Sequence, residues 1–563
     1  MPQREAGAIP RVSIGIWAEH GEGSRWTNEG MARLVGFLIE GAAESGRVTF
    51  RLVLPMAMRD EALADLRSLR ASEGVDWTLD CPEPEPEVPP VLPLLPDPIN
   101  PTVGRPSLRR RLYWRLRPGA RAAARQARAQ AAARRAAAVR ELLLAEKLQG
   151  PDREAVAAAL PDNSVHAVLD RVVQEAAAAA MAAANATDAD ALAQAEARAV
   201  SHAEDAERVA SSLRGWDRPR RHLRALAAFA NAQVKVDAWV LLFPHFVQGL
   251  ALQGRKVVIC PDTIGATDFI DVSPGNWKPE GWMMTWRRAT AQTLAKTDGT
   301  VTFSHHIARS LAGPPFAVPA ERITVVTHPP PDLRPSLPFL NDRRGDAGTR
   351  RQAADLLRAE AARREQTYLR DFPFEEVPYC VVSTQDRQTK NIGLVADALH
   401  CLVRQQRFSC KVITTAPLRG NAAWQRLPGF IAANGLGRDF VSLPDLERAE
   451  HAALYHCATI AVHASFIEGG DTVFPFHEAV SLGTPCLMAD GPHIQEFLRR
   501  APELTPFVFN PHDAEALAAL IRRTMTGREA ALDVQLSTYE RLRQRRWADA
   551  ALEYATAAIG RAP

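Results

Sequence analysis

Residues 465–485 read SFIEGGDTVFPFHEAVSLGTP, and this stretch decides the fold class. It places a glycine pair between two carboxylates, Glu468 and Glu478, and the apolar run CLMA follows it. Pro475 suits the first turn of a helix, and Gly483 is typical of the position just after a helix end. The stretch therefore predicts a loop, a short helix and a buried strand, a connection typical of parallel α/β sheets.

Apolar runs typical of buried strands recur along the chain. They occupy residues 11–17, 48–54, 238–243, 255–260, 299–303, 321–327, 379–383, 410–415, 440–443, 459–463 and 485–489. Amphipathic helical patterns, such as 29–44 and 392–405, lie between them. This alternation predicts an α/β fold with two doubly wound, Rossmann-like domains that face a cleft. Ligands of such sheets bind at the carboxyl ends of the strands.

Composition changes mark the domain boundaries. Proline recurs every few residues between 82 and 106, which excludes a helix there, and the Ala- and Arg-rich residues 107–215 favour long helices. We expect an N-terminal Rossmann-like domain in two parts, 1–81 and 216–335, separated by a Pro-rich linker and helical insertion at 82–215. An interdomain linker with a helix at 336–377 then leads to a C-terminal Rossmann-like domain at 378–545. A final helix at 546–563 is expected to pack back on the N-terminal domain.

Length and composition exclude several classes of protein. A chain of 563 residues is too long for one core, and a net charge of +3 is too small for a nucleic-acid-binding polycation, so we expect no nucleic acid partner. The seven cysteines contain no C-x-x-C pair, which argues against a disulfide framework and a zinc site. Residues 1–20 lack the apolar run of a signal peptide, and no apolar segment reaches about 18 residues. We therefore expect a cytoplasmic protein.

The chemistry of 465–485 suits an anionic ligand. Gly469 and Gly470 let the backbone approach a ligand closely, and the free N–H groups of a helix start favour a diphosphate. Glu478 lies about one turn into the expected helix and can accept hydrogen bonds from a vicinal diol such as a ribose. Glu468 faces a second polar group across the turn. The alternative is that both glutamates are ordinary surface and helix-start charges.

The run from 463 to 490 resembles the donor-site signature of the GT4-type glycosyltransferases, which are retaining enzymes of the GT-B fold. The residues that match in order are Ser465, Glu468, Gly469, Pro475, Glu478, Ala479, Gly483, Thr484 and Pro485. Nine residues, 469–477, separate the two glutamates, two more than is usual in the family. A loop tolerates such an insertion at little cost.

A second block, STQDRQTKN over 383–391, is similar to the family segment whose basic residues hold the donor diphosphate. Lys390 matches the family lysine, and Arg387 is the nearest candidate for the arginine. Two cations beside a leaving diphosphate would stabilise its charge as the glycosidic bond breaks. The resemblance further implies that Glu478 holds the ribose and that Glu468 contacts the donor sugar. The other interpretation of Lys390 is a solvated lysine at a helix start.

The N-terminal half offers weaker candidates. Family members often have a histidine where this chain has Pro261, and the next residue, Asp262, either contacts a donor hydroxyl or the acceptor or begins a turn. Gly23 lies in a glycine loop that resembles the first loop of the family, which approaches the donor phosphate. His305 and His306 fit either proton handling or an ordinary helix-start role.

The resemblance implies a glycosyltransferase of hexosyltransferase type that moves a sugar from a nucleotide-diphosphate sugar to a saccharide or lipid-linked saccharide. Polysaccharide or glycoconjugate synthesis would be its role, and no cofactor or protein-bound metal is expected. Two alternatives stay open: a nucleotide-sugar epimerase of GT-B fold and a non-catalytic GT-B binding protein. Residues 105–117 mix arginines with Tyr and Trp, which fits either peripheral contact with the inner face of a membrane or a solvated arginine face.

Overall fold

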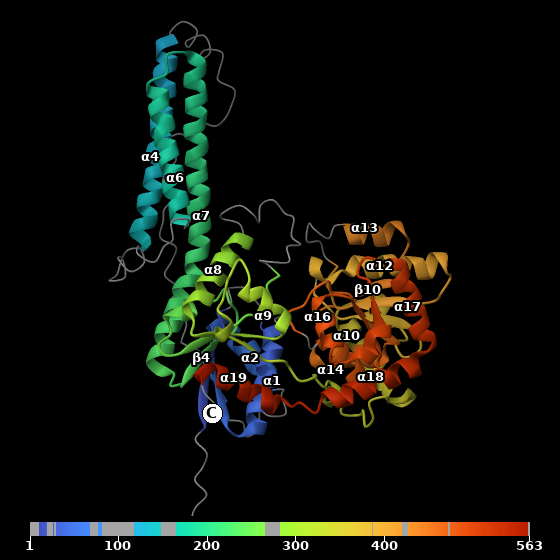
Figure 1. Ribbon diagram of the computed structural model, residues 1–563. Coiled ribbons are helices and arrows are strands. Elements are labelled where there is room, and N and C mark those ends of the chain that lie inside the picture. The colour runs from blue at the N-terminus through green and yellow to red at the C-terminus, as the bar shows by residue number, and fades with distance from the viewer. Residues whose placement is uncertain are drawn as a thin grey trace, which may run out of the picture. The chain divides into compact units, whose positions relative to one another are not determined.

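The computed structural model forms two compact units, one from residues 1–82 and 226–563 and one from residues 83–225. The described residues are 11–19, 26, 30–67, 77–81, 118–147, 165–264, 282–385, 387–418, 426–470 and 473–560. The first unit holds two parallel sheets with their helices, and the second holds a group of long helices (Figure 1). Two regions with predicted roles, Gly23 and 105–117, lie outside the described residues.

The first sheet has seven described strands in the order β3-β2-β1-β4-β5-β6-β7, and every neighbouring pair is parallel. Its strands are β1 (Val12–Trp17), β2 (Val48–Val53), β3 (Trp77–Asp80), β4 (Ala238–Leu241), β5 (Lys256–Ile259), β6 (Gly299–Thr302) and β7 (Ile323–Val325). Its helices are α1 (Gly30–Ser45), α2 (Arg59–Arg67), α8 (Trp282–Lys296) and α9 (His305–Ala312). The expected strands of this half are confirmed, whereas β3 was not expected.

The second sheet has six described strands in the order β10-β9-β8-β11-β12-β13, again all parallel. Its strands are β8 (Tyr379–Val382), β9 (Lys411–Thr414), β10 (Phe440–Ser442), β11 (Ile460–His463), β12 (Cys486–Ala489) and β13 (Val508–Phe509). The helices around it are α10 (Ala347–Arg363), α11 (Thr367–Arg370), α12 (Ile392–His400), α13 (Arg426–Ala433), α14 (Arg448–Cys457), α15 (Phe474–Ser481), α16 (Pro492–Leu498), α17 (Ala514–Thr526) and α18 (Arg528–Leu542). The strand order reverses between β8 and β11, which makes the carboxyl ends of these two strands the expected ligand position.

The chain crosses between the two sheets twice. The first crossover follows β7: Val326 still donates to Thr302 O, and Leu333 already belongs to the core of the second sheet. The second crossover follows α18 and leads to the last helix, α19 (Trp547–Ile559), which packs against α1 beside the first sheet. The Trp547 ring stacks on Phe37 with a centroid separation of 4.6 Å.

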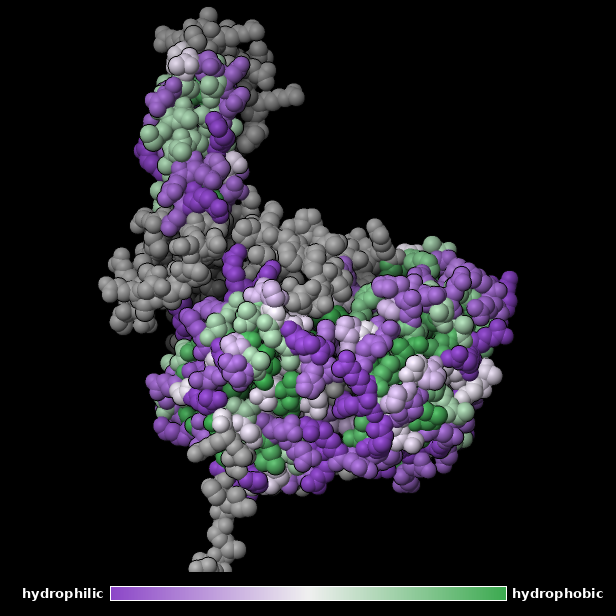
Figure 2. Space-filling view, in the orientation of Figure 1, coloured by the Kyte–Doolittle hydropathy of each residue, from purple (hydrophilic) through white to green (hydrophobic). Residues whose placement is uncertain are grey.

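The second unit contains α4 (Pro118–Lys147), α6 (Val165–Ala184) and most of α7 (Ala189–Gln233). Its core is built almost entirely from alanines, together with Leu192, because these small side chains allow close helix packing. Arg125 and Arg128 of α4 pair with Glu196 of α7 at 3.4 and 3.1 Å. The described surface of these helices is pale green and purple in Figure 2, as expected for alanine and charged residues. None of the described helices combines the length and the apolarity needed to cross a bilayer.

Candidate active site

The two sequence blocks meet at the switch point of the second sheet. The loop after β8 leads into a short 3₁₀ turn, Gln388–Lys390, and the loop after β11 carries Glu468. Phe466 N donates to Thr389 O at 2.9 Å, so a backbone hydrogen bond fastens one loop to the other. The carboxyl ends of β8 and β11 therefore bring the lysine and the first glutamate together.

Lys390 and Glu468 form an ion pair through Nζ and Oε1, and Ser465 Oγ donates to the same carboxylate oxygen at 2.5 Å. Burial alone would raise the pKa of Glu468, but the charge of Lys390 outweighs burial and holds the pKa at about 2. The carboxylate is therefore charged at neutral pH. Lys390 and Glu468 therefore place a cation and a charged hydrogen-bond acceptor side by side.

Glu478 lies in α15, where Pro475 occupies the first turn as the sequence predicts. Its side chain is only 2% exposed, and its Oε1 accepts a hydrogen bond from Arg33 Nη1 at 2.6 Å. Arg33 belongs to α1 and is 44% exposed. The carboxylate expected to hold a ribose is thus paired with a cation from the other sheet domain.

Asp262 follows β5 of the first sheet and is half-buried. Its Oδ1 accepts a hydrogen bond from Ile264 N at 3.2 Å, which is the turn geometry that the sequence left open. Burial raises the pKa of Asp262, and the charge of Glu468 raises it further, while Arg387 and Lys390 oppose the rise. Asp262 therefore lies within electrostatic reach of the second-sheet residues. The structure brings the candidates from both domains to one place.

Gly469 lies close to the backbone of the first sheet domain, whereas the sequence predicts close approach of a ligand there. A Cβ at this position would lie 1.5 Å from Pro261 O, and the Gly469 carbonyl accepts a hydrogen bond from Ser304 Oγ at 2.7 Å. Glycine is needed here because the loops of the two sheet domains touch. Gly470 follows and is half-buried, and Arg387 is exposed just before the 3₁₀ turn of Lys390.

A carboxylate from the second domain caps a helix of the first. Glu496 of α16 accepts hydrogen bonds from His305 N and His306 N, both at 2.7 Å, at the start of α9. Ser304 also caps this helix, because its Oγ accepts from Ile307 N at 3.2 Å. The backbones of His305 and His306 thus take part in helix capping, which supports the helix-start role for this pair.

Two buried histidines lie behind Glu468. The rings of His463 and His493 are 5.9 Å apart and nearly perpendicular. Burial lowers the pKa of His463 to about 4 and that of His493 to about 3, so both rings are neutral at pH 7. In the described residues, His463 Nε2 and both ring nitrogens of His493 have no hydrogen-bond partner. Lys390 therefore remains the cation that offsets the charge of Glu468.

Sequence reasoning missed several of these residues. Arg33 is one of many arginines on an amphipathic helix, and its partner lies 445 positions away. Glu496 and His493 occupy a helix that carries no recognised motif. Among the missed residues, only His463 has a recognisable sequence position, at the end of a predicted buried strand. No cluster of three or more metal-ligating side chains occurs within the described ranges.

Comparisons with known proteins bear on the family and on the fold. Residues 378–526 match the family described as Glycosyl transferases group 1, which confirms the resemblance to GT-B glycosyltransferases at that coarser level. No curated protein sequence matches the chain.

The solved structure of Alr3699/HepE supports the fold, and two further solved structures are similar at TM-scores below 0.5. Alr3699/HepE of Anabaena, solved with UDP and glucose, has a TM-score of 0.51 at 10% identity, covering 97% of this chain and 98% of its own. Sucrose-phosphate synthase of Thermosynechococcus elongatus has a TM-score of 0.45 at 17% identity, covering 60% of this chain and 77% of its own. The lipopolysaccharide outer core galactosyltransferase WaaB has a TM-score of 0.43 at 9% identity and covers 98% of this chain and 99% of its own. The fold is GT-B, as the sequence predicts.

Proposed function

We propose that this GT-B protein, whose residues 378–526 belong to the Glycosyl transferases group 1 family, is a retaining glycosyltransferase. It would move a hexosyl group from a nucleotide-diphosphate sugar to a saccharide or lipid-linked saccharide. The observation that carries this proposal is the Lys390–Glu468 ion pair at the switch point, with Asp262 of the other domain within electrostatic reach.

Each candidate residue has a chemical role in this scheme. Lys390 and Arg387 would bind the diphosphate, because guanidinium and ammonium groups form strong charge-assisted hydrogen bonds with phosphate oxygens. Glu478 would bind the ribose diol through its carboxylate oxygens. Glu468 would orient a sugar hydroxyl, and Asp262 would contact the sugar or the acceptor.

The reaction breaks the bond between the sugar anomeric carbon and the diphosphate oxygen, and the electron pair leaves with the nucleoside diphosphate. A bond from the acceptor oxygen to the same carbon forms on the same face, and the acceptor proton passes to the leaving phosphate. Lys390 would stabilise the charge that develops on that phosphate. Because the cations come from the protein, the proposed reaction needs no protein-bound metal, and activity should persist in EDTA.

The test is a transfer assay with radiolabelled donors. The HepE complexes make UDP-glucose the first donor to try, followed by GDP- and ADP-sugars. Label that appears in an oligosaccharide or lipid fraction only when acceptor is present supports the transferase. Release of free nucleotide without acceptor would instead indicate an epimerase, and donor binding without turnover would indicate a binding protein.

A lipid-linked acceptor would place the protein at a membrane surface. We propose that the cationic and aromatic residues 105–117 provide this peripheral contact. Sedimentation with vesicles tests it: binding to vesicles rich in phosphatidylglycerol should exceed binding to neutral vesicles, and replacement of the arginines in 105–117 by glutamine should remove the difference. Equal sedimentation of both proteins would refute the proposal.

A further inference from the structure

A cavity lies beside the two crossovers, and neither Lys390 nor Glu468 lines it. It has a volume of about 200 Å³, far more than the roughly 10–15 Å³ that one ordered water requires. Seven residues line it: His328, Pro330, His477, Arg500, Arg541, Leu542 and Arg545. Three are arginines and two are histidines, and no carboxylate is among the described residues of its wall.

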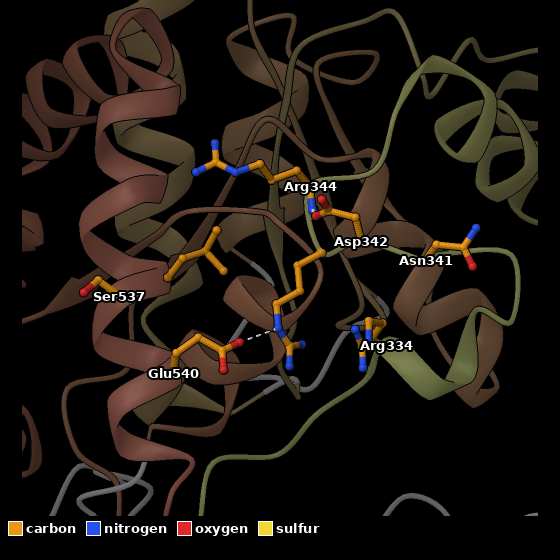
Figure 3. A pocket seen from close by; sticks show the side chains of 8 residues that line it. Arg334, Asn341, Asp342, Arg344, Ser537 and Glu540 are labelled. Carbon is orange, nitrogen blue, oxygen red and sulfur yellow. Dashed lines mark hydrogen bonds and ion pairs between the residues drawn. The ribbon is translucent and has the colours of Figure 1, made fainter.

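A larger depression differs from this cavity in the charged residues that line it. Its volume is about 420 Å³, and Figure 3 shows Asp342 and Glu540 beside the arginines that line it. The dashed line in Figure 3 marks the bond from Arg343 Nε to Glu540 Oε1 at 2.8 Å. Arg343 also pairs with Asp332 at 3.0 Å. The wall of that depression therefore carries carboxylates of its own beside its arginines.

Two arginines of the smaller cavity, Arg541 and Arg545, use only part of their N–H donors in hydrogen bonds to the protein. Arg541 Nη2 donates to Glu503 Oε1 at 2.6 Å and to Arg500 O at 3.0 Å. Arg545 donates from Nη2 to Glu553 Oε2 at 2.7 Å and from Nε to Thr327 O at 3.0 Å. A guanidinium has five N–H groups, so Arg541 and Arg545 each have further donors beyond these hydrogen bonds. Both carboxylate partners lie outside the cavity wall.

His477 supplies independent evidence for a ligand. The residue is 1% exposed, it lines the cavity, and its Nδ1 has no hydrogen-bond partner within the described residues. A buried polar nitrogen without a partner costs about 1–3 kcal/mol. Burial and the charge of Arg500 hold the pKa of His477 at about 3, so the ring is neutral and offers one N–H donor. A bound anion would satisfy Nδ1 in the tautomer that carries the ring proton on this nitrogen.

We propose that this cavity is a second anion site that binds the phosphate group of a small phosphorylated metabolite. Planar guanidinium groups suit phosphate oxygens, and no acidic side chain is among the described residues that line the cavity. His328 and Arg545 lie in the two crossovers, and His477 precedes Glu478 in α15. A bound phosphate would therefore tie both crossovers to the helix of the donor-site glutamate. This site goes beyond the proposed transfer reaction.

Titration calorimetry with inorganic phosphate, at constant ionic strength in chloride, tests the site in the full chain. We expect the wild type to bind phosphate with a dissociation constant of about 1 mM or lower, both alone and when saturated with UDP. Lys390→Ala should retain this phosphate site, because Lys390 does not line the cavity. Glycerol 3-phosphate should bind at least as well as phosphate if the natural ligand is a phosphate monoester.

Variants locate the binding. Arg541→Gln and Arg545→Gln should each weaken phosphate binding at least about tenfold, since each removes a charge-assisted hydrogen bond. Arg543→Gln is the matched control, because Arg543 is exposed, pairs with Glu540 at 3.1 Å and does not line the cavity. The proposal is overturned if the wild type binds no phosphate, or if Lys390→Ala or UDP removes the binding. Affinity that survives both glutamine variants would also overturn it. The measurement on Lys390→Ala does not depend on nucleotide binding. It therefore tests the phosphate site even if the protein is not a transferase.

Discussion

Arg33 Nη1 donates to Glu478 Oε1 at 2.6 Å, and this ion pair joins α1 of the first sheet domain to α15 of the second. The glutamate is almost fully buried, whereas the arginine is 44% exposed. The pair therefore fixes the position of the carboxylate within α15. The same contact also stabilises the docking of the two domains.

We expect Arg33→Ala to lower the free energy of unfolding by about 1–3 kcal/mol, because it leaves a buried carboxylate without its cation. A double-mutant cycle with Glu478→Gln, measured by urea denaturation, should give a coupling of about 1 kcal/mol or more. Arg59 and Asp60 form a matched exposed pair at 3.4 Å, and their cycle should give less than about 0.5 kcal/mol. Equal coupling in the two cycles would show that the Arg33 pair is only a surface contact.

Gly469→Ala should destabilise the protein by about 1–3 kcal/mol or separate the two sheet domains, because its Cβ would overlap Pro261 O. Transfer activity should fall with it. Gly437→Ala is the control, since no atom lies within 4 Å of a Cβ there. Thermal melts of the two variants decide the matter: similar melting temperatures would mean that the loops do not touch in solution.

Glu496→Ala should cost about 1–3 kcal/mol, because it removes two hydrogen bonds to the backbone N–H groups at the start of α9. Hydrogen exchange at His305 and His306 should accelerate, which a purely local effect on α16 would not cause. Glu515→Ala, at an exposed position in the first turn of α17, serves as control. Unchanged exchange at His305 would contradict the capping contact.

The buried histidines make stability depend on pH. The pKa of His493 falls from 6.5 to about 3 on folding, chiefly because of burial. Between these values the unfolded chain binds a proton that the folded ring does not, so stability decreases as pH falls from 6.5 toward 3. Each such histidine contributes a slope of up to about 1.4 kcal/mol per pH unit. His493→Gln should reduce the slope measured by denaturation between pH 7 and 4.5, while His512→Gln, at an exposed position, should retain it. An unaltered slope in His493→Gln would contradict the burial of a neutral ring.

The sequence was sufficient for the fold because its strands are continuous apolar runs bounded by turn residues. The motif at 465–485 also placed Pro475, Glu478 and Gly483 correctly along α15 and its end. The brief strand β13 escaped notice because two residues carry no pattern. β3 was missed because its four residues, WTLD, are too few for an alternating pattern to stand out.

Long-range partners could not be predicted. The glycine pair suggests ligand approach, yet the atom nearest a Cβ at Gly469 belongs to Pro261, more than 200 residues away in the chain. Likewise, nothing local distinguishes Arg33 from its neighbours, because an ion pair between two domains depends on how the domains dock. Periodicity and turn chemistry are local, whereas these contacts are set by tertiary packing.

The most direct test of the donor site is UDP binding to the wild type, to Lys390→Ala and to Lys411→Ala, measured by titration calorimetry. Lys411 is a fair control, because its Nζ pairs with Asp439 at 2.9 Å on the edge of the second sheet. We expect Lys390→Ala to weaken UDP binding about tenfold or more, and we expect Lys411→Ala to bind UDP with the affinity of the wild type. Equal UDP affinity in all three proteins, or no binding of UDP, GDP or ADP to the wild type, would contradict a donor diphosphate at Lys390.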